Sequence, residues 1–311
     1  MTRPGTRLTR AADPGPVWPE VAAGPETGPG ALPVGSPGKV GVLDLDFRKD
    51  TGGRTVLARR HQKSPLQVMR PLYVDPALPH VPVTYVMSTG GGVVGGDRLD
   101  TDIRVADGAH VVVTTQAATR VHRTDVGYGT QTVSLTLGRG AVCEWVPDPL
   151  IPFAGSRFQQ RLVAEVPDDA VLVAADVLTA GRVARGERWD LDALVSTVEI
   201  VRPGGDPVAV DTTRIVGAEA AHPLVVGAAG AMGTLFVVAP GPAAELAGVL
   251  RDATADAPGC RAGVSTLPDG AGAWVRLVGD GQEEVEGAVR AAWSASRTHI
   301  LGAPAPDLRK S

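Results

Sequence analysis

The stretch RLDTDIRV at residues 98–105 decides the fold class. Its positions alternate between a dry face and a wet face, which is the period of a half-buried β strand. The two faces carry Leu99, Thr101, Ile103 and Val105 against Asp100, Asp102 and Arg104. The stretch TVSLTL at residues 132–137 has the same period. We therefore predict that both stretches are strands with one side packed against a core.

Segments of similar texture continue on both sides of residues 98–105. Residues 43–48 alternate apolar and charged side chains, and Gly, Pro and Asp separate further candidates roughly every ten residues. These candidate strands are residues 54–61, 66–74, 81–88, 109–115, 129–137, 141–146, 158–166, 170–178, 187–202 with an interruption, and 206–216. The pattern predicts a mainly β protein with many short strands in stacked sheets.

The C-terminal part mixes helices with strands. The predicted order is a strand at 233–239, a helix at 242–256, strands at 261–267 and 273–279, and a helix at 282–298. In the last helix Val285, Val289 and Trp293 are four residues apart, so they share one face. Glu283 and Glu284 lie in its first turn, where the helix dipole favours negative charge. We therefore expect two helices in a C-terminal β-α-β-β-α stretch.

The N-terminal region differs in composition from the rest. Residues 1–38 contain eight prolines and seven glycines, with Trp18 as the only aromatic residue. Such a segment buries too little apolar area to offset its ordering entropy, so we predict a disordered tail. Residues 39–311 are then a single domain, with a β body at 39–216 and a helix-containing part at 217–311.

Composition excludes several function classes. The chain has 311 residues, a formal net charge of -4 and only two cysteines, Cys143 and Cys260. This charge gives no electrostatic footprint for nucleic acid or for an anionic membrane. No apolar run approaches the ~20 residues of a spanning helix, and the N-terminal region lacks the apolar core of a signal peptide. We therefore expect a cytoplasmic protein with neither a disulfide framework nor a cysteine-rich zinc site.

The densest glycine motif is STGGGVVGGDRL at residues 88–99. Gly90 to Gly95 satisfy G-x-G-x-x-G, but a dinucleotide site needs a helix to follow, and the following residues alternate as a strand. No Lys-Ser or Lys-Thr pair completes a P-loop. We expect a tight loop between two strands that fixes the position of Asp97, because glycine tolerates close approach and positive φ.

Common catalytic motifs are absent from the sequence. The six histidines form no H-E-x-x-H pair, and no G-x-S-x-G nucleophile elbow occurs. Polar residues instead interrupt apolar strands, at Thr114 and Gln116, at Cys143 and Glu144, and at the turn that ends in Glu187. Each of these alone is explained by an ion pair or a solvated turn, whereas their joint occurrence suggests a functional arrangement.

Six blocks in series carry a resemblance to a known family. They are LYVDP (72–76), PHVPV (79–83), GGGVVGGDRL (90–99), TTQAATRVHR (114–123), EWVPDPLIPF (144–153) and GRVARGE (181–187). In this order the blocks resemble the urease accessory protein family UreD, also called UreH. The resemblance extends from about residue 39 to residue 302.

The resemblance implies a mostly β scaffold that acts with UreF- and UreG-like proteins to insert nickel into apo-urease. It implies no enzyme, no tightly bound cofactor, and nickel only in transit. An incomplete set of oxygen ligands would let such an ion move on. Our candidates for a transient metal path are Asp97, Glu144, Asp148, Asp176 and Glu187, with Thr114, Gln116 and Cys143 as neighbours.

A binding protein for a small anionic ligand is the alternative hypothesis. It would use the glycine loop together with Arg120, Arg123 and Arg182. Binding to the two accessory partners distinguishes the hypotheses, because a ligand-binding module does not need them.

Overall fold

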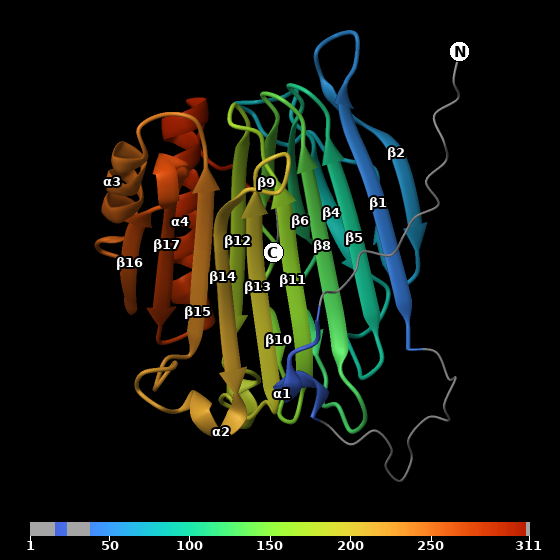
Figure 1. Cartoon of the computed structure of the whole chain (residues 1–311), viewed down its shortest axis with the longest axis vertical. Helices are drawn as coiled ribbons and strands as arrows, with labels where there is room; N and C mark the ends of the chain where they lie inside the picture. The colour runs from blue at the N-terminus through green and yellow to red at the C-terminus, as the bar shows by residue number, and fades with distance from the viewer. Residues whose placement is uncertain (1–15, 24–37, 309–311) are drawn as a thin grey trace.

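The computed structural model describes residues 16–23 and 38–308. In this part of the chain two β sheets are stacked, and two helices cover the outer face of one sheet (Figure 1). The seven-stranded sheet has the order β14-β13-β11-β8-β5-β1-β2. Its strands are β1 (Val40–Lys49), β2 (Thr55–Lys63), β5 (Arg98–Val105), β8 (Gly129–Leu137), β11 (Arg157–Glu165), β13 (Ala193–Val201) and β14 (Pro207–Val216).

The second sheet has ten strands among the described residues, with the path β16-β17-β15-β12-β9-β6-β4-β3. Strands β10 and β7 pair with each other beside β12. Its strands are β3 (Leu66–Val68), β4 (Val83–Ser88), β6 (His110–Thr115), β7 (Thr119–Val121), β9 (Val142–Trp145), β10 (Leu150–Pro152), β12 (Val171–Thr179), β15 (Ala231–Val238), β16 (Cys260–Thr266) and β17 (Gly272–Gly279).

The helices are concentrated in the C-terminal part. They are α1 (Pro19–Ala22), α2 (Gly217–Ala220), α3 (Ala243–Thr254) and α4 (Gln282–Leu301), with 3-10 turns at Val183–Arg185 and Pro268–Gly270. Helices α3 and α4 lie against the end of the ten-stranded sheet formed by β15, β16 and β17 (Figure 1).

The chain winds back and forth between the two sheets from β4 to β13. Consequently β5, β8, β11 and β13 are parallel neighbours in one sheet, and β4, β6, β9 and β12 are parallel neighbours in the other. Parallel strands need a crossover connection, and here a strand of the opposite sheet supplies it. The winding places inward-facing side chains of many strands opposite one another.

Strand alternation divides the interior into two cores. Residues of even number on β12, such as Leu172, Ala174 and Leu178, face the seven-stranded sheet. The intervening Val173, Ala175 and Val177 face the second core, on the side of the sheet that α4 contacts. The same strand therefore serves both cores, which explains why its sequence is almost continuously apolar.

The mainly β prediction, including the two C-terminal helices, is confirmed. Two strands are shorter than predicted. Strand β3 ends at Val68, because Pro71 and the later prolines remove backbone donors. Strand β13 begins only at Ala193, since the chain turns before it and Trp189 adopts φ +58°.

The N-terminal region contains a docked segment. Residues 16–23 include α1 and lie on β11 and β13 (Figure 1). The Val21 side chain is fully buried. The prediction of disorder is therefore wrong for these eight residues, because composition does not reveal one valine that matches an apolar patch formed by Ala193 and Val195. Residues 1–15 and 24–37, which the same prediction covers, lie outside the described residues.

Candidate functional site

A small cavity lies between the two sheets. Its volume is about 50 Å³, room for a few water molecules. Strands of both sheets supply its polar wall, which includes Thr115, Gln131, Asp148, Gln160, Asp176 and Ser196. We call this space the inner cavity. It brings together two of the five predicted carboxylates, Asp148 and Asp176.

Asp176 faces the seven-stranded sheet from β12. Its carboxylate accepts hydrogen bonds from Gln160 Nε2 at 3.0 Å and from Ser196 Oγ at 2.6 Å. Desolvation raises the pKa of Asp176 above its ordinary value of 3.8, although these two hydrogen bonds oppose the change. The group therefore holds a proton more readily than an exposed aspartate, and a cation at this point would compete with that proton.

Asp148 follows β9 and is held by Thr115 at the end of β6. The Thr115 hydroxyl donates to Asp148 Oδ2 at 3.0 Å, and the Asp148 backbone N–H donates to the same hydroxyl at 2.8 Å. This reciprocal pair fixes the carboxylate at the cavity wall. The result is a rigidly placed carboxylate on the wall of the inner cavity.

Two larger spaces adjoin the inner cavity. The loop cavity, about 180 Å³, lies beside Gly90, Gly91 and Gly92 and shares Thr115, Thr119, Gln131 and Trp145 with the inner cavity. The helix groove, about 550 Å³, runs along α4 and shares Pro147, Asp148 and Ala175 with it. The three spaces are therefore adjacent in series, and Asp148 lies where the inner cavity meets the helix groove.

Asp97 braces the glycine loop instead of lining a cavity. Its carboxylate accepts the backbone N–H groups of Lys39 at 2.9 Å and Val94 at 3.0 Å, and the Lys39 ammonium lies 3.3 Å away. The loop needs its glycines: Gly92 has φ +146°, and a Cβ there would lie 2.5 Å from His122 Nε2. These contacts agree with an elbow that holds Asp97 in place.

Glu144 belongs to a buried ion-pair cluster between β9 and α4. It accepts hydrogen bonds from Trp293 Nε1 at 2.5 Å and Arg297 Nε at 3.1 Å, and lies 2.6 Å from His110 Nε2. Burial alone would raise the pKa of Glu144, but these partners outweigh it and hold the pKa below its ordinary value. Both Glu144 oxygens are therefore engaged in contacts that stabilise the fold.

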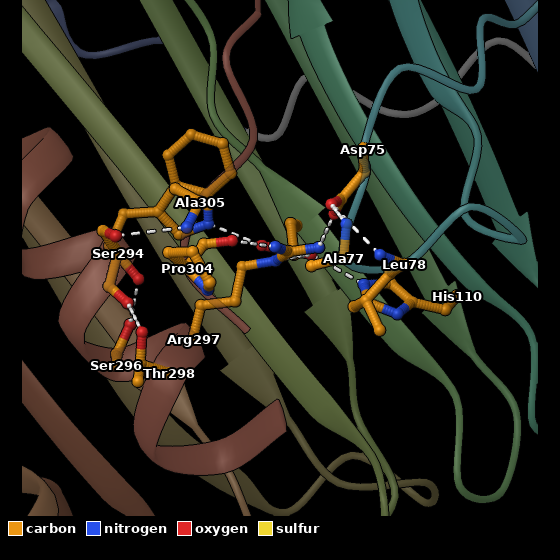
Figure 2. Close-up of polar contacts among 12 residues, drawn as sticks. Asp75, Ala77, Leu78, His110, Ser294, Ser296, Arg297, Thr298, Pro304 and Ala305 are labelled. Atoms are coloured by element: carbon orange, nitrogen blue, oxygen red, sulfur yellow. Dashed lines mark hydrogen bonds and ion pairs between the residues drawn. The ribbon is translucent and has the colours of Figure 1, made fainter. Parts of the chain in front are cut away.

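Arg297 connects this cluster to the rest of the chain. Its guanidinium also donates to Asp75 Oδ2 at 2.5 Å and to the carbonyl of Pro304 (Figure 2). The exposed fraction of the side chain is 0% for Arg297 and 1% for Asp75. One arginine therefore fastens α4 and the segment after it to the β body.

The remaining predicted carboxylate is near the molecular surface. Glu187 pairs with Arg182, Nε to Oε2 at 2.8 Å, and accepts the Ala154 N–H at 3.2 Å. The hydrogen bond from Arg182 lowers the pKa of Glu187. This ion pair closes the turn between β12 and β13.

The three predicted neighbours occupy different environments. Thr114 faces the helix side of β6 and donates to the Val146 carbonyl at 2.6 Å, whereas Gln116 is exposed beside the loop cavity. Cys143 is fully buried in the core between the sheets. Burial and the nearby Glu144 raise the pKa of the Cys143 thiol to about 12, so the thiolate ligand form is disfavoured.

The arginines of the anionic-ligand hypothesis do not converge. Arg182 pairs with Glu187 and lies over the Phe153 ring, and Arg123 pairs with Asp125 at 2.8 Å. Arg120 lines the loop cavity. Two of the three positive charges are therefore already neutralised by partners in the chain.

Gln131, Gln160 and Ser196 also line the inner cavity but are not predicted from the sequence. Each occupies an inward position on a strand whose neighbouring inward positions are apolar, for example Gln160 between Phe158 and Leu162 on β11. The signal available in the sequence was a polar residue at a strand position where the alternation predicts an apolar one. Their proximity to Asp176 depends on the stacking of the sheets, which alternation does not reveal.

Within residues 16–23 and 38–308, no group of three or more His, Cys, Asp or Glu side chains is arranged to hold a metal ion. Oxygen donors around the inner cavity come largely from amides and hydroxyls. In the same part of the chain no helix is both long and apolar enough to cross a membrane.

Comparison with known proteins assigns the chain to a class. A sequence profile described as UreD urease accessory protein matches residues 39–311. Urease accessory protein UreD 2 of Streptomyces griseus is 46% identical over 287 residues, covering 91% of this chain and 97% of that protein. Urease accessory protein UreD of Haloarcula marismortui is 38% identical, covering 89% and 92%. That of Cenarchaeum symbiosum is 34% identical, covering 90% and 99%.

The stacked-sheet fold and these matches define a urease accessory protein, a class that takes part in urease maturation. More particularly, the chain belongs to the UreD family. The family carries the name of an accessory protein and not that of a catalyst.

Proposed function

We propose that this chain is a nickel-insertion scaffold that acts in the cytoplasm with UreF- and UreG-like partners and apo-urease. The observation that carries the proposal is the series of three adjacent spaces, with Asp148 and Asp176 on the wall of the inner cavity. Nickel is the cargo, and the chain itself catalyses no step.

The chemistry of the wall suits transit better than storage. Carboxylate, amide and hydroxyl oxygens are weak ligands for Ni²⁺ compared with imidazole or thiolate. Asp148 and Asp176 each offer a carboxylate, and Thr115, Gln131 and Gln160 offer neutral oxygens. An ion held by one carboxylate at a time is released readily to the next position.

The proposal assigns different roles to the other predicted residues. Asp97, Glu144 and Glu187 hold the glycine loop, helix α4 and the turn before β13, respectively. Replacement of any of these three residues would disturb the structural elements around the proposed path. Replacement of Asp148 or Asp176 would remove a metal ligand from the path while leaving those elements in place.

The test is nickel delivery in cells that co-express urease with its accessory proteins. Asp148→Asn and Asp176→Asn should assemble normally by gel filtration yet yield urease with at least several-fold less nickel. Asp169→Asn, an exposed carboxylate at a distant turn, is the matched control. If both cavity variants deliver nickel as well as the control, the ion travels by another route and the chain is a docking scaffold only.

A further inference from the structure

Residues 16–23 occupy a defined surface on the outer face of the seven-stranded sheet. Side chains from three neighbouring strands contact the segment: Arg157 and Gln159 of β11, Val195 of β13 and Arg214 of β14. In Figure 1 the helix of this segment, α1, lies near one end of the sheet in front of these strands. We call residues 16–23 the strap.

The strap is recognised through its backbone as well as its side chains. The Gln159 side-chain amide accepts the Trp18 N–H at Oε1, 3.0 Å, and donates from Nε2 to the Pro16 carbonyl at 3.2 Å. This two-point contact reproduces the pairing that a neighbouring strand would offer. Arg157 Nη1 adds a longer contact to the Glu20 carbonyl at 3.4 Å.

Two strap side chains supply sequence selectivity. Val21 is fully buried against Ala193 and Val195, with Val17 and Tyr128 at the edge of the cluster. This cluster is separate from the two main cores. Glu20, the preceding residue, accepts from Arg214 Nε at 2.8 Å. The surface therefore selects a glutamate followed by an aliphatic residue.

The fit of the strap is incomplete. Within residues 16–23 and 38–308, Glu20 Oε2 and Arg157 Nε are both buried without a hydrogen-bond partner. Buried polar atoms without partners oppose binding. Glu20 belongs to the strap, so Arg157 Nε is the unpartnered atom of the surface itself, and a ligand with an acceptor for Arg157 Nε would bind this surface better than the strap does.

We propose that this surface is a peptide-docking site, that the strap fills it as an intramolecular ligand, and that a partner segment with glutamate followed by an aliphatic residue displaces the strap. Ligand and site belong to one chain, so the effective concentration of the strap is on the order of millimolar. A separate peptide must compete with this high effective concentration of the strap. Partners with low affinity for the surface are therefore excluded.

The experiment uses a fluorescent, end-blocked peptide of residues 16–23, PVWPEVAA, added to the full-length chain. Val21→Asp in the full chain should release the strap and open the site, whereas Ala22→Asp adds the same charge at an exposed position. We expect the Val21→Asp chain to bind the peptide at least tenfold more tightly than the wild type and the Ala22→Asp chain do. A peptide that itself carries Val21→Asp should not bind.

A second measurement guards against misfolding of the variant. Val21 and Ala22 donate their backbone N–H groups to the Trp18 carbonyl, so their hydrogen exchange reports the docked strap. Their exchange in the wild type should accelerate when excess unlabelled peptide is added. The milder Val21→Ala replaces Val21→Asp if the thermal transition of the latter is lost. Equal peptide affinity for all the chains, or no binding by any of them at millimolar peptide, overturns the proposal.

Discussion

Arg297 of α4 donates to Glu144 of β9 at 3.1 Å across 153 positions of sequence, and both side chains are fully buried. The contact joins the helical layer to the middle of the ten-stranded sheet. A buried charge pair of this kind is tolerated because additional hydrogen bonds satisfy both groups. The Arg297 guanidinium also donates hydrogen bonds to Asp75 and to the Pro304 carbonyl. The Glu144 carboxylate also contacts His110 and accepts a hydrogen bond from Trp293.

Arg297→Met should lower the free energy of unfolding by about 3–5 kcal/mol, because it leaves the buried carboxylates of Glu144 and Asp75 without their cation. Denaturant unfolding measures the change. Arg251→Met, at an exposed position of α3, should change stability by no more than ~0.5 kcal/mol. Equal losses in the two variants would mean that the cluster does not hold α4 in place.

Asp176 should give stability a pH dependence of unusual sign. Its folded pKa is raised above 3.8, so the folded chain binds this proton more tightly than the unfolded chain does. Stability therefore rises as the pH is lowered through the raised pKa toward 3.8, by at most ~1.4 kcal/mol per pH unit from this group. The comparison is urea unfolding of the wild type and Asp176→Asn across that range. The variant should lack this increment, and identical pH profiles would contradict the assignment.

The glycine loop offers a matched pair of substitutions. Gly92→Ala should cost about 1–3 kcal/mol, because Gly92 has φ +146° and the added Cβ would lie 2.7 Å from the Arg120 carbonyl oxygen. Gly91→Ala meets nothing within 4 Å and should cost less than ~0.5 kcal/mol. Thermal melting of the two variants checks the difference. A Gly92→Ala chain as stable as Gly91→Ala would show that the loop tolerates other backbone conformations.

Much of the fold follows from local pattern. Alternation at residues 98–105 and 132–137 predicts β5 and β8 with the correct inward faces, because each strand has one dry side. The sheet order does not follow in the same way. Parallel neighbours such as β5 and β8 are separated by two strands of the opposite sheet, so their pairing depends on how the chain winds.

The candidate site was accessible from the sequence only in part. The sequence predicts Asp148 and Asp176 as residues of a transient metal path, and both lie on the wall of the inner cavity. Glu144 was selected by the same reasoning, yet its partner Arg297 lies at the far end of the chain. Whether a strand carboxylate faces a cavity or an ion pair depends on which side of the strand it occupies and on what packs there.

Adjacent threonines of β6 provide the sharpest test of the proposed path. Thr115 faces the inner cavity and donates to Asp148, whereas Thr114 faces the helix side and donates to the Val146 carbonyl. Thr115→Val keeps the side-chain volume but removes the hydrogen bond that positions the Asp148 carboxylate at the cavity wall, so we expect urease with several-fold less nickel after co-expression. Thr114→Val should lower stability by about 1 kcal/mol through its lost hydrogen bond while nickel delivery persists. Metal analysis of purified urease and denaturant unfolding of each variant separate the two effects. If Thr114→Val impairs nickel delivery as much as Thr115→Val at equal protein abundance, the cavity side of β6 has no special part in transit.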